Sequence, residues 1–210
     1  MIMKLIEALL SNPLLYRLHA VGVDRPKQAA IRKLCSDYSG LKVLDLGCGP
    51  GNTAGIFAGA DYTGVDINEK YIIAARKSYP DWKFIAGDVN RVEWGRGFDI
   101  ILINSLLHHL DDNEVSQIML TAAAALNQKG KIIIQEPLIP GKGEWCCRLI
   151  MRLDRGNYFR SLADWKRLME TVGLFPDDVS FYELRVLGCK NYHMVSMLLD
   201  NLAPPSAGLN

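Results

Sequence analysis

Short apolar runs, separated by polar and glycine-containing segments, divide the chain into alternating strands and helices. The first five runs predict buried parallel strands, and the segments between them have helical character. Two more strand-like runs follow near the end of the chain. This alternation predicts an α/β fold. The predicted strands are 43–46, 61–66, 82–86, 98–103, 130–135, 179–187 and 192–199.

Residues 1–39 are expected to form helices ahead of the main domain. Apolar residues recur at helical spacing from the start, and Pro13 either kinks this helix or begins a second short one. A further helix is expected over 24–38, with Pro26 in its first turn. These helices either pack against the domain or form a lid that carries Tyr16 towards the substrates; weak membrane-surface contact is the least favoured reading.

Two capping boxes mark later helices. Asp111 and Glu114 predict the start of a helix that runs through Leu126. Ser161 and Asp164 predict another, over 161–172. Asp111 and its neighbour Asp112 could also be metal ligands. Capping explains the two acids more simply, so no metal site is expected.

A glycine cluster follows the first strand directly. Asp45, Gly47, Gly49 and Gly51 form the pattern Asp-x-Gly-x-Gly-x-Gly, and Asn52 stands where a dinucleotide fingerprint has its third glycine. This difference argues against NAD as the cofactor. Glycines permit a tight turn and let a ligand approach the backbone. Because the next residues have helical character, the loop is expected to feed a helix N-terminus.

Asp66 ends the second strand about 20 residues after Gly47, a spacing that suits hydrogen bonds from the two hydroxyls of a ribose. The alternative is that Asp66 caps the following helix. Asn68 can fill that capping role itself, so ribose binding is the favoured interpretation.

These motifs resemble the class I S-adenosylmethionine-dependent methyltransferases of the small-molecule type, with domains like methyltransferase domains 11 and 25. The resemblance covers roughly residues 40–136. It implies a three-layer α/β/α sandwich around a seven-stranded, mostly parallel sheet with an antiparallel last strand. Residues 40–200 would form the cofactor-binding domain, with an acceptor-side insertion at about 137–160. The tail, 201–210, is expected to be disordered.

The resemblance implies S-adenosyl-L-methionine as cofactor and S-adenosyl-L-homocysteine as product. Asp45 would organise the ammonium, Asp66 would hold the ribose, and Ile67 would pack on the adenine. Asp88 and Val89 match the positions that recognise the adenine edge. The cofactor-binding set so implied is Asp45, Gly47, Cys48, Gly49, Gly51, Asp66, Ile67, Asp88, Val89, Asn104 and Ser105.

The segment 104–112 resembles the one between cofactor and acceptor in small-molecule methyltransferases such as those of quinone and sterol biosynthesis. Ser105, not proline, follows Asn104, which argues against DNA adenine or protein glutamine as the acceptor. His108 and His109 are the candidates for a catalytic base, because imidazole titrates near neutral pH. One is expected to face the pocket, and the other to be structural.

The acceptor side is less clear from sequence. Tyr16, His109 and Tyr158 are candidate substrate-binding residues, and His19 and His193 are weaker ones. Basic residues in and near the insertion either face an anionic acceptor or lie solvated on a cover helix. These residues are Lys142, Arg148, Arg152, Arg155, Arg160 and Lys166.

Composition narrows the partners. A formal net charge of +1 gives no reason to expect a nucleic acid or an anionic membrane as partner. The five cysteines include no Cys-x-x-Cys pair, so reduced thiols in a cytoplasmic protein are the simplest account. The N-terminus is too interrupted for an export signal or a bilayer span, so no membrane span is expected.

The predicted function is transfer of a methyl group to an oxygen, nitrogen or carbon atom of a small-molecule acceptor. One alternative keeps the fold and cofactor but serves another reaction or a non-catalytic role. Another is a methyltransferase acting on RNA or protein. Both a monomer and a homodimer remain open.

Overall fold

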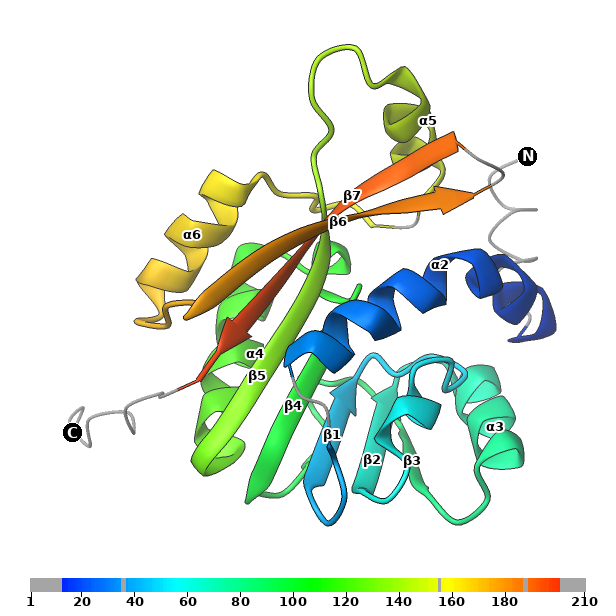
Figure 1. The fold of residues 1–210 in the computed structure, drawn as a ribbon. Helices are drawn as coiled ribbons and strands as arrows, with labels where there is room; N and C mark the ends of the chain where they lie inside the picture. The colour runs from blue at the N-terminus through cyan, green and yellow to red at the C-terminus, as the bar shows by residue number, and fades with distance from the viewer. Residues whose placement is uncertain (1–12, 35–36, 155, 187–188, 201–210) are drawn as a thin grey trace.

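The computed structural model describes residues 13–34, 37–154, 156–186 and 189–200, and a seven-stranded sheet lies at its centre (Figure 1). The strand order is β3-β2-β1-β4-β5-β7-β6. β7 is antiparallel to both of its neighbours, and all other pairs are parallel, which confirms the predicted sheet. The strands are β1 Lys42–Leu46, β2 Asp61–Asp66, β3 Lys83–Ala86, β4 Phe98–Asn104, β5 Leu126–Leu138, β6 Asp178–Val186 and β7 Cys189–Leu199.

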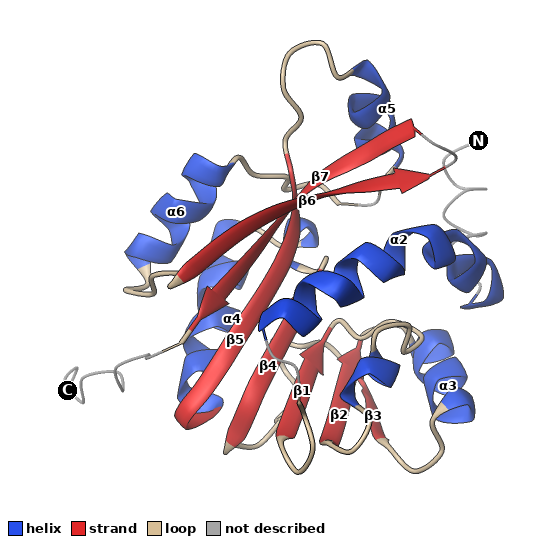
Figure 2. Ribbon diagram, in the orientation of Figure 1, coloured by secondary structure: helices blue, strands red, loops and turns tan. Residues whose placement is uncertain are grey.

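Helices cover both faces of the sheet and complete three layers (Figure 2). One face carries α2 (Pro13–Leu34), α3 (Glu69–Ser78) and the 3₁₀ turn η1 (Ala54–Phe57). The other carries α4 (Asp112–Ala125) and α6 (Leu162–Thr171). The 3₁₀ turn η2 (Leu107–His109) follows β4, and α5 (Trp145–Leu153) packs against β7 beyond the end of β5.

Two apolar cores hold these layers together. Alternate residues of the parallel strands point to opposite faces, so Leu44 and Ile101 join the core beneath α4, while Val43 and Ile100 join the core beneath α2. Trp165 of α6 is fully buried in the first core. The strands are apolar on both faces because both faces are covered.

Both predicted capping boxes are confirmed. The Asp111 side chain accepts from the backbone of Asn113 and Glu114, and the Glu114 carboxylate accepts from the Asp111 N–H. Ser161 and Asp164 make the equivalent pair at the start of α6. β5 is longer than predicted, because it continues to Leu138 through antiparallel pairing with β7 and begins at Leu126 across a bulge opposite β4.

The prediction of separate helices around Pro13 and over 24–38 is wrong for the described part of this region. α2 is one helix that contains Pro26 and ends at Leu34. An internal proline removes one hydrogen bond and costs about 3 kcal/mol in an isolated helix. Tertiary contacts offset this cost: α2 packs on β6, and the Gln28 side-chain amide donates to the Asn52 carbonyl at 3.1 Å.

The prediction of a helix directly after the glycine loop is also wrong. The segment forms only the short turn η1. Gly55 lies in this turn and Gly59 follows it, and glycine weakens a helix. A Cβ on Gly55 would lie 3.0 Å from the Tyr79 hydroxyl, so the chain packs closely here without a regular helix.

Two expectations lie outside the described residues: the helix at the start of the chain and the disordered tail at 201–210. None of the described helices has the length and apolar character needed to cross a membrane.

Candidate functional site

A cavity of about 400 Å³ lies at the carboxyl ends of the parallel strands. Ligands of open α/β sheets bind at this edge, where neighbouring strands lead to opposite faces. The cavity brings together most of the residues predicted for the cofactor. Its lining is Gly47, Gly49, Asp66, Ile67, Asn68, Tyr71, Asp88, Val89, Asn104, Ser105, Leu106, His109 and Leu110.

The glycine loop reaches the cavity through its backbone. Gly47 and Gly49 have φ angles of +76° and +55°, a region that side chains disfavour. The N–H groups of Gly47 and Cys48 both donate to the Val65 carbonyl, which ties the loop to β2. Gly51 does not line the cavity. A Cβ at this position would lie 3.2 Å from the Tyr79 ring, and the backbone has a φ of +80°, so glycine is needed here for close packing and for the turn.

Asp66 organises the loop as well as the cavity. One carboxylate oxygen accepts from the Gly49 N–H at 2.9 Å, and the other accepts from the Asn68 N–H at 2.8 Å. Each carboxylate oxygen has a further lone pair. Asn68 caps α3 by accepting from the Lys70 N–H, so the helix does not depend on Asp66 for its cap.

Asp45 and Cys48 lie beneath the loop and not on the cavity wall. Asp45 is 1% exposed and accepts from the Tyr62 hydroxyl at 2.7 Å. Burial raises the pKa of Asp45 to about 7, the Tyr62 hydrogen bond opposes that shift, and the charge of Asp66 adds to it. Cys48 is buried too, and burial raises the pKa of its thiol. Asp45 could therefore reach a ligand only through water or the loop above it.

Ser105 joins the cavity to α2. It has a φ of +56°, unusual for a residue with a side chain, and its hydroxyl accepts from the Lys27 ammonium at 2.7 Å. The Gln135 side-chain amide donates to the Lys27 carbonyl, so α2 is fixed at the ends of β4 and β5. Burial lowers the pKa of Lys27, and Asp24, Glu136 and Asp154 oppose that shift. No motif in the sequence marks Lys27.

The two adjacent histidines have different environments. His109 lines the cavity, and its ring centroid lies 4.2 Å from that of His108. His108 is 4% exposed, and its Nδ1 lies 2.7 Å from the Glu136 carboxylate. Its Nε2 lies 3.6 Å from the Asp154 carboxylate, and the Phe159 ring stacks on it.

His108 is a buried cation. Burial by itself lowers the pKa of His108, but Glu136 and Asp154 more than reverse this and raise the pKa to about 9. The same contacts, led by the His108 hydrogen bond, hold the pKa of Asp154 well below its usual range against the effect of burial. A protonated histidine with a carboxylate at each nitrogen cannot accept a proton near neutral pH.

Glu136 completes this group at the end of β5, and the sequence analysis did not single it out. It is fully buried, and its Oε1 accepts from the N–H groups of Leu106 and Leu107. The carboxylate thus fixes the start of η2 and the His108 ring together. The only sequence signal was an acid at the end of an apolar strand.

The segment 137–160, the predicted acceptor-side insertion, is fastened over η2. The Tyr158 N–H donates to the His108 carbonyl at 2.9 Å. Gly156 packs against His108 so closely that a Cβ on Gly156 would lie 2.2 Å from the ring. The Tyr158 side chain is 43% exposed and does not line the cavity. The side chain of Tyr16, the third candidate, lies outside the described side chains.

The prediction that the basic residues either face an acceptor or lie solvated is wrong for Arg160. Its guanidinium is 5% exposed, bonds Asp112 at 2.6 and 2.9 Å, and lies over the Trp165 ring. It also donates to the carbonyls of Leu107, Leu110 and Tyr158. Arg160 is therefore a clamp between the insertion and η2. Lys142, Arg148 and Arg152 are exposed.

Among the described residues, two groups bring three possible metal ligands together: His108 with His109 and Asp154, and Glu144 with Cys147 and His193. Both nitrogens of His108 already face carboxylates, which leaves the first group poorly suited to a cation. The two acids that the sequence offered as metal ligands have other partners. Asp111 caps α4, and Asp112 forms an ion pair with Arg160.

The cavity residues fit S-adenosylmethionine. A carboxylate at the end of β2 suits a ribose, and the open glycine backbone suits the methionine part. Ile67 is 74% exposed beside the cavity, which leaves an apolar surface for a flat ring, and Asp88 lies on the same wall. The fit thus rests on Asp66, Gly47, Gly49, Ile67 and Asp88.

Part of the chain is similar to known methyltransferases. Residues 43–130 match a model described as "Methyltransferase domain". Trans-aconitate 2-methyltransferase of Escherichia coli O139:H28 is 30% identical over 131 residues, which cover 60% of this chain and 50% of that protein. The chain thus spans about half the length of the curated relatives it matches.

Solved structures share the fold. Magnesium protoporphyrin IX methyltransferase of Synechocystis PCC 6803, solved with bound S-adenosylhomocysteine, has a TM-score of 0.66 at 21% identity, over 87% of this chain and 84% of that one. Mitomycin 7-O-methyltransferase has a TM-score of 0.65 at 20% identity, over 91% and 59%. Residues 43–130 are thus similar to a methyltransferase domain, and the chain has the fold of these solved methyltransferases.

Proposed function

We propose that the protein transfers the methyl group of S-adenosylmethionine to an oxygen, nitrogen or carbon atom of a small-molecule acceptor. The observation that carries the proposal is Asp66, which lies in one cavity with the glycine backbone and with His109. Bound S-adenosylmethionine supplies an electrophilic methyl group on a positively charged sulfur. The chain therefore has to align the reactants and exclude water.

The cofactor-side roles follow from position in the cavity. Asp66 accepts from the ribose hydroxyls at the cavity wall, where its bonds from the N–H groups of Gly49 and Asn68 hold the carboxylate in place. Asp88 and the Val89 backbone meet the edge of the adenine, and Ile67 packs on its face. The carbonyls of Asn104 and Ser105 are available to the ammonium, with Asp45 acting from below through water.

The domain organisation is part of this proposal. α2 acts as a lid, held to the site by the bond between Lys27 and Ser105. Residues 137–160 form the acceptor-side insertion of a domain that covers 40–200. The proposed compartment is the cytoplasm, in keeping with a Cys48 that forms no disulfide.

Calorimetry tests the cofactor. S-adenosylmethionine and S-adenosylhomocysteine are expected to bind one per chain, and NAD is expected not to bind, because Asn52 replaces the third glycine of a dinucleotide loop. Turnover is then followed as release of S-adenosylhomocysteine with a panel of small carboxylic acids and phenols, trans-aconitate among them. Tight NAD binding would overturn the cofactor assignment. Cofactor binding without turnover on any acceptor would favour the alternative of a non-transferring protein.

His109 is the proposed base, since it lines the cavity and His108 does not. An acceptor hydroxyl or amine gives its proton to a ring nitrogen of His109 as it takes the methyl group. His109→Ala is expected to lower kcat by about 10²–10⁴-fold, the usual contribution of a general base, while cofactor affinity stays the same. The measurement is turnover with any acceptor that the panel returns, together with calorimetry.

His109→Gln is the size-matched control for this prediction, because a glutamine can hydrogen-bond but cannot take up the proton. It is expected to be as slow as His109→Ala. If either variant keeps wild-type kcat and its pH profile, His109 only shapes the cavity.

A further inference from the structure

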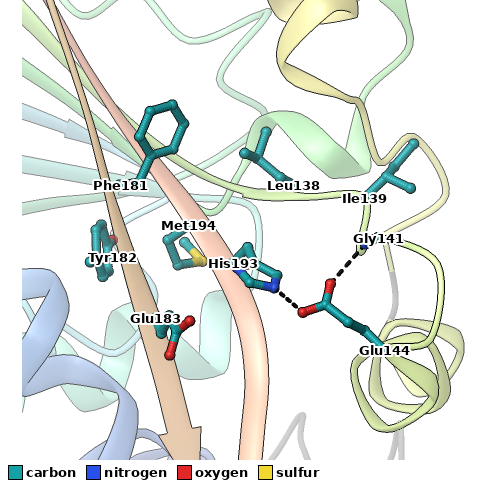
Figure 3. Close-up of a pocket in the computed structure, with 9 residues that line it drawn as sticks. All are labelled: Leu138, Ile139, Gly141, Glu144, Phe181, Tyr182, Glu183, His193 and Met194. Carbon is teal, nitrogen blue, oxygen red and sulfur yellow. Dashed lines mark hydrogen bonds and ion pairs between the residues drawn. The ribbon is translucent and has the colours of Figure 1, made fainter.

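Three side chains that bind metals well meet beside a second cavity, away from the cofactor residues. They are Glu144 and Cys147 at the start of α5, and His193 on β7. One donor atom of each lies within 4.8 Å of the other two. Figure 3 shows Glu144 and His193 pointing towards one another. Since 46 residues separate Cys147 from His193, no local sequence pattern reveals this group.

Local structure fixes the direction of each ligand. Glu144 and Cys147 are three residues apart at a helix start, so their side chains share one face. The Gly141 N–H donates to one oxygen of Glu144 at 2.8 Å, and the other oxygen lies 2.5 Å from Nε2 of His193 (Figure 3). His193 is held opposite Leu138 and Glu183 by strand pairing on both sides of β7.

We propose that Glu144, Cys147 and His193 bind a zinc ion. Zn²⁺ prefers thiolate, imidazole and carboxylate ligands at about 2.0–2.3 Å, which places the donor atoms about 3.3–3.6 Å apart around a tetrahedral ion. The donor atoms lie within 4.8 Å of one another, so Cys147 has to move inwards by no more than about 1.5 Å. The contact of 2.5 Å between His193 and Glu144 has to widen by about 1 Å. Side-chain rotation supplies both shifts.

The protons balance in this step. The Cys147 thiol loses its proton to solvent. The proton between Nε2 of His193 and Glu144 also leaves to solvent, while Nδ1 carries the one proton of the neutral ring, so that Nε2 and the carboxylate can both bind the metal. The Gly141 N–H then serves as the outer partner that keeps the carboxylate in place, a common feature of metal sites.

The fourth coordination position is open to the second cavity. This cavity has a volume of about 510 Å³ and is lined by Leu138, Ile139, Gly141, Glu144, Phe181, Tyr182, Glu183, His193 and Met194 (Figure 3). Zinc sites with three protein ligands leave one position for water or for a ligand. The proposed ion thus links α5 to β7 and presents an exchangeable position to the cavity.

The test is calorimetric titration of the full-length, chelator-treated protein with ZnCl₂, followed by Co²⁺ spectroscopy. One ion per chain is expected, with proton release and, for Co²⁺, a thiolate charge-transfer band. Cys147→Ser and His193→Ala are each expected to weaken binding at least about 100-fold, since even outer partners contribute 10- to 100-fold. His193→Cys restores a ligand and is expected to recover most of the affinity.

Cys146→Ser is the matched control, because it removes the neighbouring thiol of the same helix and is expected to bind zinc like the wild type. Circular dichroism confirms that each variant is folded. The proposal is overturned if wild-type protein binds no zinc, if Cys147→Ser and His193→Ala bind as tightly as wild type, or if Cys146→Ser weakens binding as much as Cys147→Ser. These readouts need no S-adenosylmethionine, so they stand or fall separately from the methyltransferase proposal.

Discussion

Replacing Glu136 by leucine is expected to lower the free energy of unfolding by about 3–5 kcal/mol, the usual cost of removing one partner from a buried ion pair. Glu136 is fully buried and faces the protonated His108 ring at 2.7 Å. It also accepts from the backbone of Leu106 and Leu107. The substitution therefore leaves a buried cation with one carboxylate neighbour fewer, and two N–H groups without their acceptor.

The pH dependence of stability gives this prediction a second readout. The pKa of His108 is about 9 in the folded protein, against an ordinary value of 6.5 for histidine. The folded state therefore holds a proton that the unfolded state releases, so this contribution is complete below about pH 6.5 and is lost as the pH rises to about 9. It amounts to about 3 kcal/mol at most. In Glu136→Leu this decline is expected to shrink.

Urea unfolding of the wild type and of Glu136→Leu from about pH 6 to 9.5 measures how the free energy of unfolding of each depends on pH. Taking the difference between the two proteins cancels the contribution of titrating groups that they share, such as Asp45. Glu170→Leu, on the exposed surface of α6, is the matched control and is expected to change stability by no more than about 0.5 kcal/mol. Equal pH slopes in wild type and Glu136→Leu would mean that His108 is neutral in the folded protein.

Replacing Asp66 by alanine is expected to weaken S-adenosylmethionine binding by about 1–3 kcal/mol, or roughly 5- to 150-fold, because the ribose hydroxyls lose their charged acceptor. The substitution also removes the acceptor of two N–H groups, that of Gly49 in the glycine loop and that of Asn68 at the start of α3. Calorimetry with S-adenosylhomocysteine measures the loss without interference from turnover.

Asp61→Ala is the matched control for this prediction. Asp61 begins the same strand that Asp66 ends, so its exposed side chain lies at the opposite edge of the sheet. Its removal is expected to leave cofactor affinity unchanged, and melting temperatures separate weaker binding from a weaker fold. If Asp66→Ala binds as tightly as Asp61→Ala, the ribose contact belongs to another residue.

The sheet and its cofactor edge were predictable because their signals are local. Buried strands read as short apolar runs, and Asp66 follows the glycine loop at a spacing set by one strand–turn–strand unit. The capping boxes of α4 and α6 each lie within four consecutive residues. In each case, neighbours in sequence are also neighbours in space.

The contacts around Ser105 and η2 were less predictable because they join residues that are distant in sequence. Lys27 meets Ser105 across 78 residues, and Arg160 meets Asp112 across 48. In the sequence, Glu136 is only an acid near the end of a strand, and its contact with His108 is visible only in the folded structure. The same reasoning explains the error at Pro26: local propensity predicts a helix start, while packing on β6 favours a continuous helix.

The contact between Gly156 and His108 has a consequence for how this sequence can change over time. A methyl group at 156 would overlap the imidazole, whose Cδ2 would be only 2.2 Å away. A smaller residue at 108 removes this overlap and leaves the backbone oxygen of residue 108, at 3.0 Å, as the nearest neighbour of a Cβ at 156. A side chain at 156, by contrast, forces the ring of His108 out of its place. The two positions form one inherited unit and should vary together among descendants of this chain, although 47 residues lie between them.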